Sequence, residues 1–398
     1  MGIVPESGFS GFSGFSGFSG FSGFSGFSGF SGFSGFSGYG GVAGESPALA
    51  EALITNRDGI VGTRLDHIGN VRPGLNDDPQ NLLRLAPEVR ATLYQSQLGN
   101  RVDVTFELKG DHPTATLWRR GDKNEDCQNF TFHPLVEMTS PTIEQLKIQL
   151  KHVGGYAKIR QDRGAEILTQ LGIPASFFAS IGFMDPARTP YTLEFLYAAL
   201  NFSSIVTQRM KYALAIKRPI EFSPQIQPMI ATPTHGSLPS GHATEAFLVA
   251  RLLWKLLIHS DAPQYNDGAY WGEMFMRQAA RIATNRTVAG VHFPIDSVAG
   301  ELLGLTLADH IHSQSCGGDW WSTRFDGPKF NADDDFDWHK IYTADGDRLK
   351  KKATSEYGVW AESQEHTEGS YDAPSPILAW LWKKALSEWR DLEPGQPA

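Results

Sequence analysis

Residues 239–258 read PSGHATEAFLVARLLWKLLI, a short turn followed by a run in which apolar residues occupy almost every position. A helix that is apolar nearly all round packs inside a bundle. We therefore expect a buried central helix over 243–258, capped by Ser240. Gly241 would let an anion approach the backbone, where the free N–H groups of a helix start favour negative charge. The simpler alternative is an ordinary helix start with His242 on the surface.

Two cations precede this stretch. A helix over 189–216 is expected to carry Lys211, because Thr-Pro at its start supplies an N-cap and a first-turn proline. Lys211 and Arg218 lie seven residues apart, so on one helix they would share a face. Repeated prolines then predict a stiff, non-helical loop over 219–240. The pair indicates an anion site or, more simply, a solvated cationic helix end.

A histidine and an aspartate follow the central helix. A further helix is expected over 274–289, and Pro294 opens the next, which runs to about His310. His292 then lies just before a helix and Asp296 in its first turn, close enough to accept a hydrogen bond. Such a carboxylate fixes the tautomer and makes the other ring nitrogen a better nucleophile or ligand. The alternative is a core histidine and an aspartate that only complements the helix dipole.

Outside this region the patterns are weaker. Residues 8–37 are ten copies of Gly-Phe-Ser without proline, which predicts disorder rather than a collagen helix. Ser140-Pro141 predicts a helix start. Residues 317–376 look irregular, and their acidic runs indicate a solvated surface because neither has EF-hand spacing. Short β-branched or aromatic runs predict a small hairpin or meander; they lie at 101–108, 115–119 and 129–132.

The expected fold class is mainly α, a helical bundle with a small β-containing N-terminal part. The expected parts are, in chain order, a disordered repeat (1–45), an N-terminal mixed region (46–139), a helical-bundle catalytic core (140–312), and an irregular C-terminal region with a closing helix over 377–389 (313–398).

Composition excludes several classes of protein. The chain has 398 residues and a formal charge of −9, so nucleic-acid binding is not expected. No apolar run of about 18 uncharged residues predicts a membrane span. The first residues lack a signal-peptide pattern, which makes a cytoplasmic location the default and leaves secretion open. Cys127 and Cys316 are too few for a disulfide framework, and whether they pair stays open.

Taken together, the three clusters form one pattern: Lys, six residues, Arg-Pro; then Pro-Ser-Gly-His; then Arg, five residues, His, three residues, Asp. This pattern resembles the signature of the type 2 phosphatidic acid phosphatase (PAP2) superfamily, which includes vanadium-dependent haloperoxidases and bacterial acid phosphatases. The separations also fit, with 19 residues between Pro219 and Pro239 and 42 between His242 and Asn285. Asn285 departs from the pattern, since the family usually has serine there.

The resemblance implies a role for each residue of the pattern. His292 would bond to the phosphorus or vanadium, Asp296 would orient it, and His242 would be the acid–base group on the opposite side. The anion's oxygens would be held by cations and hydrogen-bond donors, namely Lys211, Arg218, Arg286, Ser240 and the Gly241 N–H. Fixed cations of this kind stabilise the charge of a five-coordinate centre, and such a site would also hold vanadate.

The resemblance leaves the activity open between two reactions. The first is that of a vanadium-dependent haloperoxidase, which uses vanadate and hydrogen peroxide to oxidise halide to hypohalous acid that reacts with a small organic substrate. His235, seven residues before His242, is similar to a second histidine of the bromoperoxidases; the chain length and the Ala-Thr pair after His242 favour the same reaction. The alternative is an acid phosphatase that forms a phosphohistidine on His292, with phosphate at the same site.

Two further expectations concern partners. A membrane-embedded lipid phosphatase is disfavoured because charged residues interrupt the apolar segments; these are Glu245, Arg251, Lys255 and Glu301. Analogy with helical enzymes of the superfamily suggests a homodimer. A non-enzymatic phosphate-binding scaffold, assembled through its phenylalanine-rich repeat, is the remaining alternative, and it predicts oxyanion binding without turnover.

Overall fold

The computed structural model describes residues 47–60, 68–70, 74–123, 130–172, 175–367 and 374–390. The chain divides into two units, one of which includes Leu82–Ala398 while the other spans Phe18–Asn81. In the second unit, α4 (Pro47–Ile60) is a helix whose described side chains are mostly exposed. The Gly-Phe-Ser repeat and Cys127 lie outside the described residues, and Cys316 is a free thiol.

Helices dominate the chain from Pro79 onward, which confirms the predicted mainly α fold with a β-containing part. The α- and 3-10 helices are η4 (Pro79–Arg84), α5 (Pro87–Gly99), α6 (Ile143–Tyr156), η5 (Ala157–Ile159), α7 (Arg160–Thr169), α8 (Ala175–Gly182), α9 (Pro190–Leu214), α10 (Pro219–Phe222), η6 (Pro224–Ile226), α11 (Gly241–His259), η7 (Pro263–Tyr265), α12 (Gly268–Val288), α13 (Pro294–Cys316), η8 (Gly327–Lys329), η9 (Trp338–Lys340) and α14 (Pro376–Arg390). The strands are β1 (Val102–Lys109), β2 (His112–Lys123), β3 (Phe130–Thr139), β4 (Trp320–Asp326), β5 (Tyr342–Thr343), β6 (Arg348–Leu349), β7 (Lys352–Ser355) and β8 (Gly358–His366).

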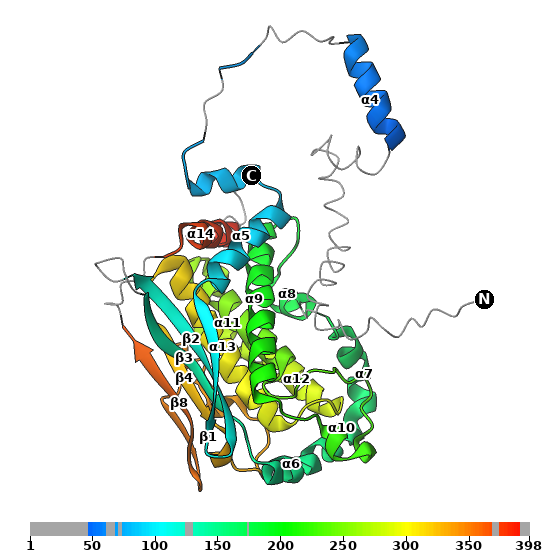
Figure 1. Ribbon diagram of the computed structural model, residues 1–398, viewed down its shortest axis with the longest axis vertical. Coiled ribbons are helices and arrows are strands. Elements are labelled where there is room, and N and C mark those ends of the chain that lie inside the picture. The colour runs from blue at the N-terminus through cyan, green and yellow to red at the C-terminus, as the bar shows by residue number, and fades with distance from the viewer. Residues whose placement is uncertain are drawn as a thin grey trace, which may run out of the picture. The chain divides into compact units, whose positions relative to one another are not determined.

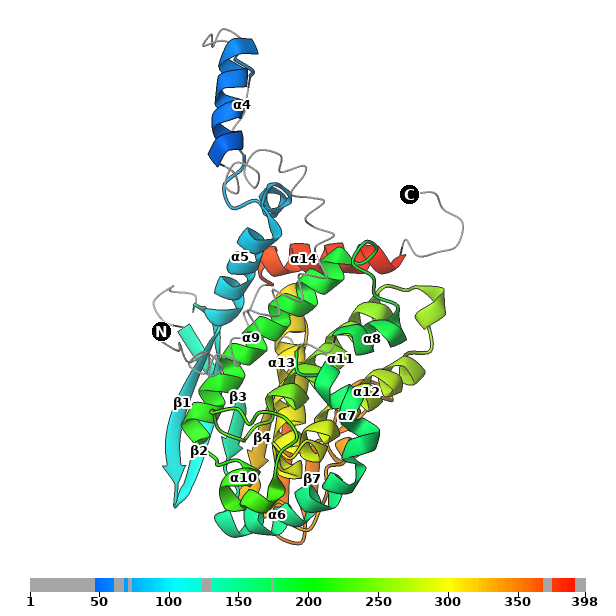
Figure 2. The same ribbon diagram turned by 90° about the vertical axis from the view of Figure 1, so that its right-hand side faces the viewer.

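The predicted central helix is α11, which packs against α9, α12, α13 and α14 and lies among them in Figure 2. Two glycines of α13 set how closely that helix approaches. A Cβ on Gly300 would lie 2.6 Å from the Ser240 carbonyl oxygen, and one on Gly304 only 2.3 Å from that of Thr244. The backbones of α11 and α13 therefore meet without intervening side chains at the start of α11. Among the described residues, no helix combines the length and apolar character that crossing a membrane requires.

A six-stranded sheet in the order β1-β2-β3-β4-β8-β7 lies along one side of α9 and α13 (Figure 1). Strands β3 and β4 pair in parallel, with Val136 opposite Thr323, and the other neighbouring strands are antiparallel. The Thr306 and Thr323 hydroxyls, 2.9 Å apart, join α13 to β4. The sheet thus joins strands of the expected N-terminal mixed region to strands of the expected C-terminal region. The boundaries given above for the four expected parts of the chain stay predictions.

Several helix and strand predictions are confirmed, among them α9, α11 and the closing helix α14. The three short runs form β1, β2 and β3. The expectation of an irregular tail is wrong, because residues 317–376 contain β4 to β8. Their pairing partners lie far away in the sequence, so the tail alone does not indicate them.

Two predicted helix boundaries are wrong for local reasons. Helix α6 begins at Ile143 rather than after Ser140, because Thr142 and Gln145 form a reciprocal capping box. Helix α9 ends at Leu214, where Ala215 adopts a left-handed conformation (φ 50°, ψ 33°). Lys211 and Arg218 therefore do not share a helix face, and Arg218 lies in extended backbone before α10.

Two charged residues within α11, Arg251 and Lys255, are paired rather than solvated. The buried Arg251 forms an ion pair through Nη1 with Asp309 on α13 at 2.6 Å, and its Nε donates to Asp347 at 2.8 Å. Lys255 also contacts both carboxylates. Asp347 was expected on a solvated acidic surface, but the Tyr342 hydroxyl also donates to it. Pairing makes these charges compatible with a buried helix.

Candidate active site

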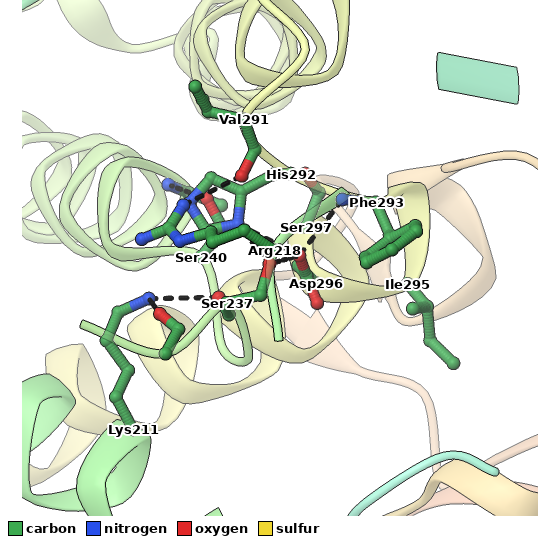
Figure 3. Close-up of polar contacts among 12 residues, drawn as sticks. Lys211, Arg218, Ser237, Ser240, Val291, His292, Phe293, Ile295, Asp296 and Ser297 are labelled. Atoms are coloured by element: carbon green, nitrogen blue, oxygen red, sulfur yellow. Dashed lines mark hydrogen bonds and ion pairs between the residues drawn. The ribbon is translucent and has the colours of Figure 1, made fainter. Parts of the chain in front are cut away.

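His292 and Asp296 meet at the start of α13, as predicted (Figure 3). Pro294 begins the helix, so Asp296 in the first turn faces back toward His292. His292 Nδ1 lies 2.9 Å from Asp296 Oδ2, which also accepts from the Phe293 N–H and from the Ser237 hydroxyl. The carboxylate can only accept from the ring, so Nδ1 carries the proton. This leaves the lone pair on Nε2.

Arg218 contacts two histidines, His292 and His235. Its Nη1 lies 2.9 Å from His292 Nε2, and its Nη2 lies 3.0 Å from His235 Nδ1. A guanidinium can only donate, so both ring nitrogens accept. Carbonyl oxygens of His235 and Val291 take further N–H groups and fix its plane. Burial lowers the pKa of Arg218 to about 10, which still leaves it charged at neutral pH.

Lys211 reaches the site from the last turn of α9. Its ammonium group donates to the carbonyl oxygens of Gly236 and Ser237, each at 2.9 Å (Figure 3). Burial lowers its pKa, and the neighbouring Arg218 charge lowers it further. A Cβ on Gly236 would lie 3.0 Å from the Lys211 carbonyl oxygen, so the loop packs tightly against the end of α9.

The start of α11 is tied to the start of α13. Ser240 caps α11, its Oγ accepting from the Ala243 N–H at 3.4 Å, and its own N–H donates to the Asp296 carbonyl oxygen at 2.9 Å. Gly241 is the first residue of the helix. His242 Nε2 donates to the Gln170 carbonyl oxygen at 2.9 Å, which leaves Nδ1 for a substrate. Burial and the Arg286 charge lower the pKa of His242 to about 3.

Arg286 enters from the last turn of α12. Its Nη2 donates to Gln170 Oε1 at 3.1 Å. Its Nε and Nη1 are buried and have no hydrogen-bond partner within the described residues. Buried donors without acceptors are costly, so these two N–H groups mark a place suited to an anion. Burial lowers the pKa of Arg286 to about 10, and the Glu245 charge opposes that shift.

The predicted residues therefore converge on one region. The charges of Arg286, Lys211 and Arg218 all lower the pKa of His242. Beyond burial, Arg218, Lys211, His242 and His235 lower that of His292 in the same way. Electrostatic interactions of this kind require the histidines and cations to lie near one another.

Four residues of the site were not singled out as site residues from the sequence. Ser237 supports Asp296, and its only signal is its place in the loop before Pro239. Glu245 lies one turn after His242 on a mostly apolar helix. Burial raises its pKa to about 7, and the charges of Lys211 and Arg286 oppose that shift. Gln170 Oε1 accepts from both Arg286 and Asn285, and nothing in the sequence points to Gln170.

Comparisons with known proteins agree with this geometry. Residues 192–315 match the family model of the PAP2 superfamily. The matched segment contains every residue of the three-part pattern. Sites of this superfamily bind phosphate or vanadate-like oxyanions, and the superfamily suggests a phosphatase-type enzyme.

The solved structures that match part of the chain include a transmembrane PAP2 type phosphatidylglycerolphosphate phosphatase from Bacillus subtilis, with 20% identity and a TM-score of 0.34 over 42% of this chain and 84% of that chain. A likeness this distant carries no information about the reaction. No curated protein is similar enough to the chain to count as a match. The described residues hold no group of three or more His, Cys, Asp or Glu side chains placed for a metal ion.

Proposed function

We propose that the chain is an enzyme that hydrolyses phosphate monoesters through a phosphohistidine on His292. The observation that carries this proposal is the tautomer of the His292 ring. Its Nδ1–H is fixed by Asp296, and its Nε2 lone pair faces buried cations. A nucleophile oriented by a carboxylate and surrounded by fixed positive charge suits attack on a phosphoryl group.

In the first step, His292 Nε2 forms a bond to phosphorus while the ester P–O bond breaks. Arg218 turns from Nε2 to an oxygen of the phosphoryl group, which it holds together with Lys211 and the free N–H groups of Arg286. The leaving alkoxide takes a proton from His242 Nδ1. These fixed positive charges are complementary to the negative charge of the five-coordinate transition state, so they stabilise that state more than they stabilise the bound substrate.

In the second step, water attacks the phosphohistidine. His242, now neutral, takes a proton from that water through Nδ1, the N–P bond breaks, and phosphate leaves. His292 regains its Nδ1–H tautomer, and His242 keeps the added proton until phosphate leaves, when its ring becomes neutral again. General acid and general base are then one residue used in opposite directions.

The test of this proposal is trapping of the intermediate. Purified protein incubated with a labelled phosphomonoester and quenched in alkali should carry label on His292. His292→Ala should abolish both the label and turnover, while Asp296→Asn should slow labelling because the tautomer is no longer fixed. Near-normal hydrolysis by the His292→Ala variant would contradict the assignment.

A second candidate is a vanadium-dependent haloperoxidase of the bromoperoxidase type. The observation that favours it is His235, whose Nδ1 accepts from Arg218 at 3.0 Å and adds a neutral imidazole to the site. The residues fit vanadate, because His292 Nε2 offers a lone pair and Arg286 offers unpaired donors. Bound vanadate supplies a Lewis acid that activates hydrogen peroxide for the oxidation of halide.

Orthovanadate separates the two candidates. The protein is stripped with chelator at low pH and assayed with and without added orthovanadate. Phosphomonoester hydrolysis that vanadate inhibits supports the phosphatase. Bromide oxidation by hydrogen peroxide that appears only with vanadate supports the haloperoxidase, whose partners would be peroxide, halide and a small organic substrate. Oxyanion binding without either turnover would leave the scaffold reading; pairing into a homodimer stays a prediction.

A further inference from the structure

Gln170 joins the two sides of the site, although it lies outside both the three-part pattern and the matched residues 192–315. It directly follows α7, as its C-cap residue, and its side chain is fully buried, with 0% exposure. A buried glutamine requires partners for an acceptor and for two donors. Its contacts show which of these the protein supplies.

The acceptors of Gln170 are satisfied. Its backbone carbonyl oxygen accepts from His242 Nε2 at 2.9 Å, and its Oε1 accepts from Arg286 Nη2 at 3.1 Å and Asn285 Nδ2 at 3.0 Å. Both side-chain partners are donors, so they fix the orientation of the amide: Oε1 faces them, and Nε2 is left for another acceptor. One residue thus sets the tautomer of His242 and the position of Arg286.

The donor of Gln170 is not satisfied. Nε2 is buried and has no hydrogen-bond partner within the described part of the chain, as is true of Nε and Nη1 of Arg286. Three buried donor atoms on two side chains in contact therefore lack an acceptor. Leaving such groups unpaired costs free energy, and an anion between them would satisfy all three.

We propose that Gln170 is a further oxyanion-binding residue, whose Nε2 donates to an oxygen of the bound phosphate while Oε1 holds Arg286. This inference rests on the proposed oxyanion site and adds a neutral donor to its cations. It also gives Asn285 a reason to replace the usual serine. The Asn285 amide donates both to Gln170 Oε1 and to Glu166 Oε2 at 3.1 Å, whereas a serine hydroxyl has one proton to donate.

Two substitutions separate the donor of Gln170 from its acceptor. Gln170→Met removes both, whereas Gln170→Glu keeps two acceptor oxygens for Arg286 and Asn285, and so keeps the fold. Gln314→Met is the matched control, since Gln314 is also buried but lies on α13 about 27 Å beyond Asp296. Calorimetry with inorganic phosphate, repeated with orthovanadate, gives the Kd of each variant.

The Kd of Gln170→Met for phosphate should rise about 10- to 100-fold, the range for losing one hydrogen bond to a charged group. Its ratio to the wild-type Kd should not change with pH. The ratio for Gln170→Glu should exceed it at about pH 8 and fall at least about tenfold by about pH 5, because a protonated carboxyl regains a donor. Gln314→Met should bind like the wild type.

Gln170→Met binding within about twofold of the wild type would overturn the inference, as would a Gln170→Glu ratio that stays constant with pH. If the wild type binds and hydrolyses substrate while these variants match it, only the role of Gln170 fails. If the wild type binds neither phosphate nor orthovanadate, the proposed function fails and the inference fails with it.

Discussion

At the scale of single residues, two neighbours fix the tautomer of His292, because each of them can play only one role in a hydrogen bond. Asp296 can only accept and Arg218 can only donate, so the His292 ring between them has one tautomer. The spacing of His292 and Asp296 predicted the first contact, because both lie at one helix start. The contact with Arg218 joins residues 74 positions apart, and no local pattern predicts it.

Phosphate binding should be accompanied by proton uptake at His242. Burial and the Arg286 charge lower its pKa to about 3, so the ring is neutral in the free protein above that pH. In the proposed reaction, a bound phosphate offsets the cations and raises this pKa, and the proton taken up is the one that His242 donates as general acid. Calorimetry at about pH 6 in two buffers of different ionisation enthalpy counts the protons taken up.

His242→Asn is the control for this measurement, because phosphate itself also titrates. The variant should take up fewer protons than the wild type while still binding phosphate through the cations. Equal proton uptake by both proteins would show that His242 is not the group that changes its protonation state.

His235→Ala should affect the two candidate reactions unequally. Burial first, then Lys211 and Arg218, lower the pKa of His235 to about 4, so it is a neutral acceptor for Arg218. Loss of this contact should change bromide oxidation at least about tenfold, but phosphomonoester hydrolysis by no more than about threefold. Both rates are measured on one preparation, with and without vanadate. Equal effects would count against a special role for His235 in halide oxidation.

At the scale of elements, the site depends on how α11 and α13 approach each other. Their starts carry Ser240 and Asp296, which are joined by a backbone hydrogen bond of 2.9 Å. Gly300 permits that approach, since its Cα lies against the α11 backbone. The apolar pattern of residues 243–258 predicted a buried helix. It did not predict which helix lies closest, because apolar packing has no direction.

Gly300→Ala should both destabilise the protein and impair the site. The added Cβ would lie 2.6 Å from the Ser240 carbonyl oxygen, which is backbone and cannot turn away. Overpacking of this kind costs about 1–3 kcal/mol of unfolding free energy. Displacement of Ser240 should also lower the hydrolysis rate. Urea unfolding and a steady-state assay measure the two effects.

Gly154→Ala in α6 is the matched control. A Cβ at Gly154 would meet nothing within 4 Å, so the substitution should add about 0.5–1 kcal/mol of stability through helix propensity. Activity should not change. If both glycine variants behaved alike, the close contact of α11 with α13 would not be what positions the site.

At the scale of the whole molecule, buried histidines make stability depend on pH. His310 on α13 is fully buried against Phe202, and neither ring nitrogen has a hydrogen-bond partner among the described residues. Burial, aided by the charges of Arg119 and Arg101, lowers its pKa well below the usual value. Folded His310 therefore stays neutral where the unfolded chain, with a histidine pKa of about 6.5, gains a proton.

His310→Leu should reduce the loss of stability on acidification. Between the two pKa values the unfolded chain binds more protons, so the free energy of unfolding falls as pH drops below about 6.5. One such histidine contributes up to about 1.4 kcal/mol per pH unit. Urea unfolding of wild type and variant at several pH values gives the two slopes. Parallel slopes would mean that the pKa of His310 is the same in the folded and the unfolded chain.

The sequence by itself determined which residues make up the candidate site. The spacing of Lys211, Arg218 and His242 with the Arg286 to Asp296 segment indicated a resemblance to the PAP2 superfamily, whose family model matches residues 192–315, and helix periodicity located α9, α11 and α13. These signals are local: a cap, a proline or an apolar face acts within one or two turns of its own helix.

Only the tertiary structure decided which elements and side chains surround the candidate site. It ended α9 before Arg218 and paired β3 with β4, two strands that lie on either side of the helical core in the sequence. It also brought Gln170, which follows α7, to Arg286 and His242. Each of these contacts joins residues distant in sequence, or depends on a single backbone conformation such as that of Ala215. Burial then lowered the pKa values of the histidines, because desolvation depends on everything packed around a group.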